Sequence, residues 1–221
     1  MTASKRITLL CGHYGSGKTN VAVNLALREK ETHEKVAVAD LDIVNPYFRS
    51  KDSIDEFHAA GIRLICSEYA NTNVDIPALP QDLYAITDDR SIRVLIDVGG
   101  DDRGALALGR LAPSILEENS YEMLMVINGY RPLTRDAQST MEVLQEIEAA
   151  CRIPFTGLVN NSNLGRETTA DDVLATLDYA NEVSRLSGLP VVMTTFSEKL
   201  LPALEKKVPH PFPLRLQKKI I

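Results

Sequence analysis

A glycine-rich run near the start of the chain has the composition of a phosphate-binding loop. Gly12-His13-Tyr14-Gly15-Ser16-Gly17-Lys18-Thr19 fits the pattern G-x-x-x-x-G-K-[ST]. Glycines let the backbone curl so that its N–H groups face an anion, and a following helix directs its positive end at the same point. In such a loop the lysine reaches the β- and γ-phosphate oxygens, and the hydroxyl of the last residue binds Mg²⁺. We therefore predict a nucleotide site made of these eight residues and Asn20, with Lys18 also catalytic and Thr19 on the metal.

Carboxylates follow two apolar segments downstream of this loop. Asp97 is the penultimate residue of the apolar stretch 93–98, which Gly99-Gly100 follows. Asp40 ends the apolar stretch 35–40, and Asp42 lies in the turn after it. A carboxylate at a strand end beside a phosphate loop can hold Mg²⁺ through water, the Walker-B role. Two carboxylates beside such a centre can also position a water molecule and accept its proton. The alternative is that all three are ordinary turn or helix-cap residues.

Asparagines after a later apolar segment are candidates for reading the base. The sequence Asn160-Asn161-Ser162-Asn163 lacks the Lys and Asp of the Asn-Lys-x-Asp sequence with which GTPases bind guanine. An asparagine amide can instead pair with the N6 donor and N7 acceptor of adenine. We predict that Asn160 or Asn161 reads adenine, and that the nucleotide is ATP. The sequence leaves the choice between the two residues open, and turn asparagines are the alternative.

These residues can meet only if alternating strands and helices bring them to one edge of a sheet. Apolar runs predict strands over 6–11, 35–40, 62–67, 93–98, 122–128, 155–160 and 190–195. Helical patterns fill the intervals at 18–31, 51–60, 81–86, 101–118, 134–150, 168–186 and 198–207. Repeated β-then-α units predict a three-layer α/β P-loop NTPase fold, with a mostly parallel central sheet and helices on both faces. Residues 1–221 are expected to form a single ATP-binding domain, with 210–221 as a flexible terminal tail.

Composition narrows the classes of protein further. The 221 residues carry 24 Lys and Arg against 30 Asp and Glu, a net charge of −6, which argues against nucleic acid as a habitual partner. The longest apolar run, Met123–Ile127, is far short of the roughly 20 residues that cross a bilayer, so no membrane partner is expected. Three scattered cysteines, Cys11, Cys66 and Cys151, suit reduced thiols in the cytoplasm.

The sequence resembles the MinD/ParA-like P-loop ATPases of the CobQ/CobB/MinD/ParA nucleotide-binding group in three features. These are the phosphate loop, Asp40-Leu41-Asp42, and the strand-end Asp97 with the two glycines after the strand. The resemblance runs from residue 6 to about residue 205. It implies that Asp42 orients the attacking water, that Asp40 supports the metal shell, and that Asp97 is the Walker-B aspartate. It also implies ATP and Mg²⁺ as cofactors, switch segments at 40–49 and 97–103, and a homodimer formed around the nucleotide.

One position departs from the pattern of these ATPases. His13 stands where they carry a second lysine that reaches across a dimer to the partner's nucleotide. A mostly neutral imidazole is a poor substitute for that charge. We therefore expect slow Mg-dependent ATP hydrolysis that drives a switch, acting in the assembly or maturation of an unidentified protein partner. One alternative is a carboxylate-activating synthetase or small-molecule kinase on the same scaffold, with its acceptor pocket in the irregular segment 68–90. Another is a nucleotide-binding module without useful turnover.

Overall fold

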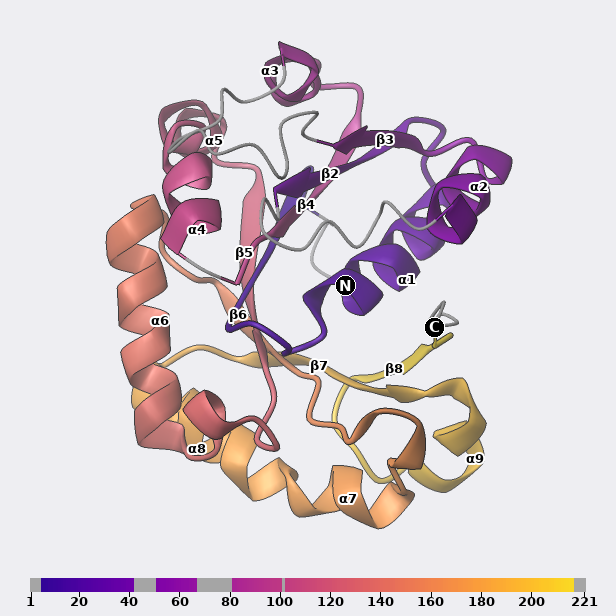
Figure 1. The fold of residues 1–221 in the computed structure, drawn as a ribbon, viewed down its shortest axis with the longest axis vertical. Coiled ribbons are helices and arrows are strands. Elements are labelled where there is room, and N and C mark those ends of the chain that lie inside the picture. The colour runs from indigo at the N-terminus through magenta and orange to yellow at the C-terminus, as the bar shows by residue number, and fades with distance from the viewer. Residues whose placement is uncertain (1–4, 42–50, 67–80, 101, 217–221) are drawn as a thin grey trace.

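Eight strands form one sheet, and every strand pair in it is parallel (Figure 1). The computed structural model describes residues 5–41, 51–66, 81–100 and 102–216. The strand order is β3-β2-β4-β1-β5-β6-β7-β8. The strands are β1 Ile7–Cys11, β2 Val36–Leu41, β3 Arg63–Cys66, β4 Arg93–Val98, β5 Tyr121–Ile127, β6 Gly157–Asn160, β7 Val191–Ser197 and β8 Pro211–Leu214.

Helices cover both faces of the sheet, because successive side chains of a buried strand point to opposite faces. In β1, Leu9 packs in one hydrophobic cluster and Leu10 in the other. The Leu10 face is covered by α1 (Lys18–Lys30) and α2 (Lys51–Ala59). The Leu9 face is covered by α3 (Gln81–Asp88), α4 (Asp102–Gly109), α5 (Ala112–Glu118), α6 (Ala137–Cys151) and α8 (Leu177–Ser187). The predicted three-layer α/β fold is confirmed.

Two predicted long helices are each divided in two. The segment 101–118 contains α4 and α5, with a break at Arg110 and Leu111. Proline 113 lies in the first turn of α5, where its missing N–H costs no intrahelical hydrogen bond. The segment 168–186 divides at Thr176 into α7 (Ala170–Ala175) and α8. The predicted helix 198–207 is reduced to a 3₁₀ turn at Glu198–Leu200 and the short α9 (Leu201–Leu204).

The structure differs from the prediction at the start of the tail. Residues expected to be a flexible extension from 210 onward include β8, which pairs with β7 and forms one edge of the sheet. Phe212 and Leu214 are buried against the α1 face of the sheet. Pro211 and Pro213 alternate with them and suit an edge strand, because proline cannot donate to a further strand. Residues 217–221 lie outside the described part.

Among the helices that the structure describes, none has the length and apolar character needed to span a bilayer.

Candidate functional site

The phosphate loop connects β1 to α1 at the carboxyl edge of the sheet. It turns back on itself through a hydrogen bond from the Ser16 N–H to the His13 carbonyl, at 3.1 Å. Gly17, the last residue before α1, has a φ of +89°, in the left-handed region that glycine adopts without strain. No side chain caps the start of α1, and its first turn carries no acidic residue. The first N–H groups of this helix are therefore directed at a position where an anion can bind.

Lys18 is held over the loop at the start of α1. Its side chain is only 6% exposed, and its Nζ donates to the His13 carbonyl at 3.3 Å. A buried ammonium group is costly unless anions or dipoles surround it. A phosphate bound in the loop would supply that negative charge.

Oxygen ligands for a cation meet beside the loop. Thr19 donates a 2.6 Å hydrogen bond from its hydroxyl to Oδ2 of Asp97, the penultimate residue of β4. Asp40 of β2 lies directly opposite Asp97 in the parallel pairing, and both carboxylates are buried. A hydroxyl and two carboxylates form an all-oxygen donor set, which is what Mg²⁺ prefers. The site thus fits the predicted metal, while Asp42 lies outside the described residues.

The segment that follows Asp97 packs on the phosphate loop. A Cβ atom placed on Gly100 would lie 2.5 Å from the backbone nitrogen of Tyr14. Only glycine permits this approach, so the residues after β4 and the apex of the loop are in backbone contact. At that apex the Tyr14 side chain is exposed, and the His13 ring lies 2.9 Å from the Tyr14 carbonyl through Nδ1.

The two asparagines predicted to read adenine are both buried and bonded to protein groups. Asn161 donates from Nδ2 to the Ser16 carbonyl at 2.6 Å, and its Oδ1 accepts a 2.5 Å hydrogen bond from Thr195 of β7. Asn160 donates to the Thr176 hydroxyl at 3.2 Å and accepts from the Ser162 side chain at 2.7 Å. Asn161 therefore positions the phosphate loop, and base reading by either amide stays a prediction.

A small cavity of about 100 Å³ lies next to one of these asparagines, Asn161. Its walls come from the start of α1 and from the ends of β6, β7 and β8. They are formed by Gly17, Asn20, Asn161, Asn163, Gly165, Thr168, Phe196, Ser197, Leu214 and Leu216. We call it the base-side cavity, because it adjoins the phosphate loop through Gly17 and Asn20. Three of the predicted nucleotide-binding residues line it, namely Gly17, Asn20 and Asn161.

Several residues of this site were not predicted from the sequence. Arg131, in the connection after β5, donates from Nε to the Gly15 carbonyl at 2.9 Å and so braces the loop from outside. Asn163 lines the base-side cavity, where its Nδ2 donates to the Asn161 carbonyl at 2.6 Å. Both residues follow strands at the carboxyl edge of the sheet, where the phosphate loop lies. That position was the only feature of the sequence that could have indicated them as site residues. Thr195 carried no signal, because its contact depends on the pairing of β6 with β7.

The thiol of Cys11, at the end of β1, has low reactivity. Burial raises the pKa of Cys11 well above its ordinary value, nearby Cys151 raises it further, and Lys18 opposes the shift. Both cysteines are buried free thiols. Cys11 therefore stays protonated beside the phosphate loop and acts as a small apolar residue.

No protein-family model matches this chain, and no curated protein is significantly similar to it. Solved structures, however, share its fold. Cell division protein FtsY from Thermotoga maritima matches with a TM-score of 0.58 and 19% identity, over 90% of this chain and 64% of that one. Chloroplast FtsY from Physcomitrella patens matches with a TM-score of 0.56 and 18% identity, over 88% of this chain and 59% of that one.

A third similar structure contains a nucleotide. The signal recognition particle 54 kDa protein from Aeropyrum pernix, in complex with GDP, matches with a TM-score of 0.53 and 18% identity. The match covers 86% of this chain and 41% of that protein. The chain thus spans less than two thirds of the length of each of these three proteins. At these identities the likeness establishes the α/β P-loop NTPase fold.

Proposed function

We propose that this chain is a MinD/ParA-like P-loop ATPase that binds Mg-ATP, hydrolyses it slowly and acts as a nucleotide-driven switch. The observation that carries the proposal is the Thr19–Asp97 hydrogen bond beside the curled loop. It joins the residue that would bind Mg²⁺ directly to the carboxylate that would hold the metal's water shell. Lys18, at the other side of the same helix start, supplies the charge for the β- and γ-phosphate oxygens.

The base-side cavity favours adenine over guanine in this proposal. Guanine presents donors at N1 and N2, which GTPases bind with a carboxylate. None of the described residues that line the cavity is acidic. Its lining offers instead the amide of Asn163 and the hydroxyls of Thr168 and Ser197. GDP is bound in the Aeropyrum pernix protein, so base choice is the property in which this chain would differ from that neighbour.

Slow turnover follows from the charges around the loop. His13 bonds through its ring to the Tyr14 carbonyl, and Arg131 bonds to the Gly15 carbonyl. Arg131 donates to a loop carbonyl from outside, whereas Lys18 is buried at the start of α1, so Lys18 is the cation that we assign to the phosphates. The contact between Gly100 and the loop apex would transmit the loss of the γ-phosphate to the segment after β4.

A protein partner would bind across the nucleotide edge of the sheet. Three exposed apolar side chains lie in connections that follow strands at this edge, with Tyr14 at 60%, Leu133 at 56% and Leu164 at 46% exposed. If a partner covers this edge, these side chains would be buried in the contact. A second copy of this chain is the partner implied by the MinD/ParA resemblance.

The proposed compartment is the cytoplasm. The buried free thiols of Cys11 and Cys151 support a reducing compartment of this kind.

Steady-state phosphate release tests the proposal, with ATP affinity measured in parallel. The wild type should release phosphate slowly without any acceptor, and faster at higher protein concentration if it dimerises. Asp42→Ala should abolish most of this turnover and leave ATP affinity within about twofold, because an unpositioned water raises the transition-state energy alone. His13→Lys should accelerate turnover in a dimer, and His33→Lys, which alters a histidine far from the loop in the sequence, is its control. Turnover that strictly requires an added carboxylate or other acceptor would instead establish the synthetase or kinase alternative.

A further inference from the structure

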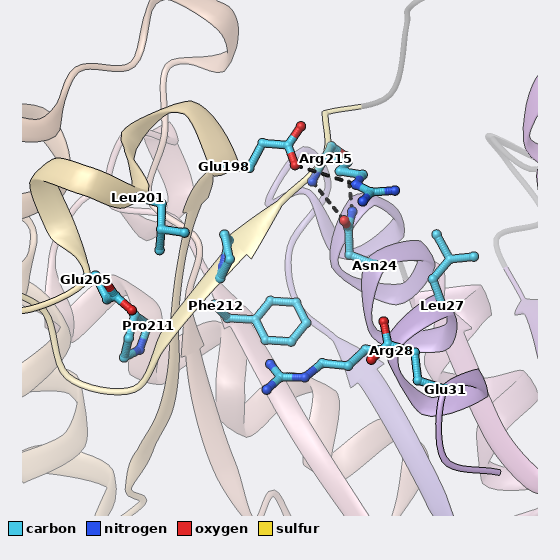
Figure 2. Close-up of a pocket in the computed structure, with 11 residues that line it drawn as sticks. Asn24, Leu27, Arg28, Glu31, Glu198, Leu201, Glu205, Pro211, Phe212 and Arg215 are labelled. Carbon is cyan, nitrogen blue, oxygen red and sulfur yellow. Dashed lines mark hydrogen bonds and ion pairs between the residues drawn. The ribbon is translucent and has the colours of Figure 1, made fainter.

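The end of β8 is tied to α1 by one side chain. Asn24 lies on α1, and its Oδ1 accepts from the Arg215 backbone N–H at 2.8 Å. Its Nδ2 donates to the Arg215 carbonyl at 3.1 Å and to the Asn20 carbonyl at 2.8 Å. Figure 2 shows Asn24 facing Arg215, with dashed lines between them. One amide therefore holds both polar groups of one residue, as a neighbouring strand would.

The second tether of Arg215 is weaker. Its guanidinium Nε lies 3.5 Å from Oε2 of Glu198, which follows β7 (Figure 2). Both side chains are more than half exposed, and ion pairs in such surroundings contribute little. Asn24 is therefore the main constraint on the backbone at Arg215.

The residues on either side of Arg215 line the base-side cavity. Leu214 is buried and Leu216 is 42% exposed. Asn20, whose carbonyl accepts from Asn24, also lines the cavity. The Asn24 amide thus holds the backbone at Arg215, between the lining residues Leu214 and Leu216. The same amide bonds to Asn20, another residue that lines the cavity.

We propose that Leu214 and Leu216 form the apolar wall against which the base of a bound nucleoside triphosphate packs, and that Asn24 is the positioning residue that holds this wall. The inference rests on the proposed function, because it requires that the base occupy the base-side cavity. Asn24 contributes nothing to the phosphates, which bind at the amino end of the same helix. Loosening the wall should therefore weaken binding of the nucleoside part and leave binding of the phosphate part unchanged.

The test compares the dissociation constants of Mg-ATP and of Mg-tripolyphosphate, which has no base. Asn24→Asp keeps the acceptor for the Arg215 N–H, but it loses both donors and faces two carbonyls with a negative charge. It should weaken ATP binding roughly fivefold, the loss expected for a hydrogen bond of ordinary strength, and change tripolyphosphate binding less than twofold. Asn181→Asp makes the same substitution on an exposed position of α8 and should change neither constant.

Leu216→Ala removes the exposed part of the wall and should reproduce the selective loss for ATP. Because both substitutions act on one wall, the double variant should lose little more than the larger single effect. Equal losses for ATP and tripolyphosphate would overturn the assignment, as would unchanged ATP affinity in Asn24→Asp. A wild type that binds neither ligand would refute the proposed function. Hydrogen exchange over 212–216 in the nucleotide-free protein then still tests the tether: faster exchange in Asn24→Asp supports it, and unchanged exchange overturns it.

Discussion

The two halves of the proposed nucleotide site are built in different ways. In the phosphate half, Lys18 and Thr19 are adjacent residues of one motif, and Thr19 donates to a carboxylate near the end of the neighbouring strand β4. In the base half, the contacts join residues far apart in the chain. Asn161 and Ser16 are separated by 145 positions, and Asn24 and Arg215 by 191.

In the proposed site, this difference follows from what each half would bind. Phosphates and Mg²⁺ are alike in every nucleoside triphosphate, so their chemistry fixes both the residue types and the short spacing of the loop. A base is bound by shape and a few hydrogen bonds, which many combinations of side chains provide. The phosphate half can therefore be predicted from a motif, whereas the base half depends on which strands the fold brings together.

The largest effect should come from removing the cation of the phosphate half. In Lys18→Ala the loop amides remain, but the β- and γ-phosphate oxygens lose their charged donor. We expect ATP affinity to fall by about 100-fold, or roughly 2.7 kcal/mol, measured by calorimetric titration. Lys206→Ala, an exposed lysine remote from the loop in sequence, is the control. An affinity within threefold of wild type would exclude this loop as the nucleotide site.

A smaller effect is expected from the metal side of the same half. Asp97→Asn keeps the size of the side chain and an acceptor for the Thr19 hydroxyl, but it removes the negative charge. The gain in ATP affinity on adding Mg²⁺ should fall about tenfold, and affinity in EDTA should be nearly unchanged. The measurement is a pair of titrations with and without the metal. Asp178→Asn, on an exposed turn of α8, should leave both constants as they are.

Sequence patterns predicted the fold to the extent that each element is stabilised locally. Continuous apolar runs identified the buried strands, and β4 is buried at all six positions. The last strand was missed because β8 has only four residues, two of them prolines, and is stabilised by pairing with β7 and by burial of Phe212. The division of the predicted helix 168–186 at Thr176 likewise depends on tertiary packing.

The candidate site, like the fold, could be predicted where it depends on local sequence and not where it depends on contacts between distant elements. The structure brings Thr19, Asp40 and Asp97 together, as the place of Thr19 in the loop motif and of the two aspartates near strand ends suggests. The sequence could not indicate that the amides of Asn160 and Asn161 bond to Thr176 and Ser16, because those partners come from distant elements. Asn24, Arg131 and Thr195 were missed for the same reason.

Base preference tests the base half directly. We expect ATP to bind at least tenfold more tightly than GTP, a difference of about 1.4 kcal/mol, in a competition titration. Asn163→Asp would place a carboxylate in the base-side cavity, where it can accept from guanine, and should narrow the preference several-fold. Asn181→Asp controls for the added charge. Equal affinity of the wild type for both nucleotides would show that the base is read elsewhere.

The smallest effect should come from the residue that joins the two halves. Thr195 donates to Asn161, which in turn donates to the Ser16 carbonyl of the phosphate loop. Thr195→Val keeps the shape of the side chain and removes only this hydroxyl. It leaves the Asn161 oxygen without its donor, so we expect about 1 kcal/mol of lost stability and roughly threefold weaker ATP binding.

The neighbouring residue provides a matched control. Thr194 is as buried as Thr195, at 1% exposed, but its hydroxyl has no hydrogen-bond partner among the described residues. Removing an unsatisfied buried hydroxyl is neutral or stabilising, so Thr194→Val should raise or maintain the free energy of unfolding and leave ATP affinity unchanged. Urea denaturation and ATP titration of both variants measure the contrast. If the two variants lose stability equally and bind ATP equally well, then the Asn161–Thr195 bond does not couple the base half to the phosphate loop. If only Thr195→Val weakens ATP binding, the two halves of the site act together through that single hydroxyl.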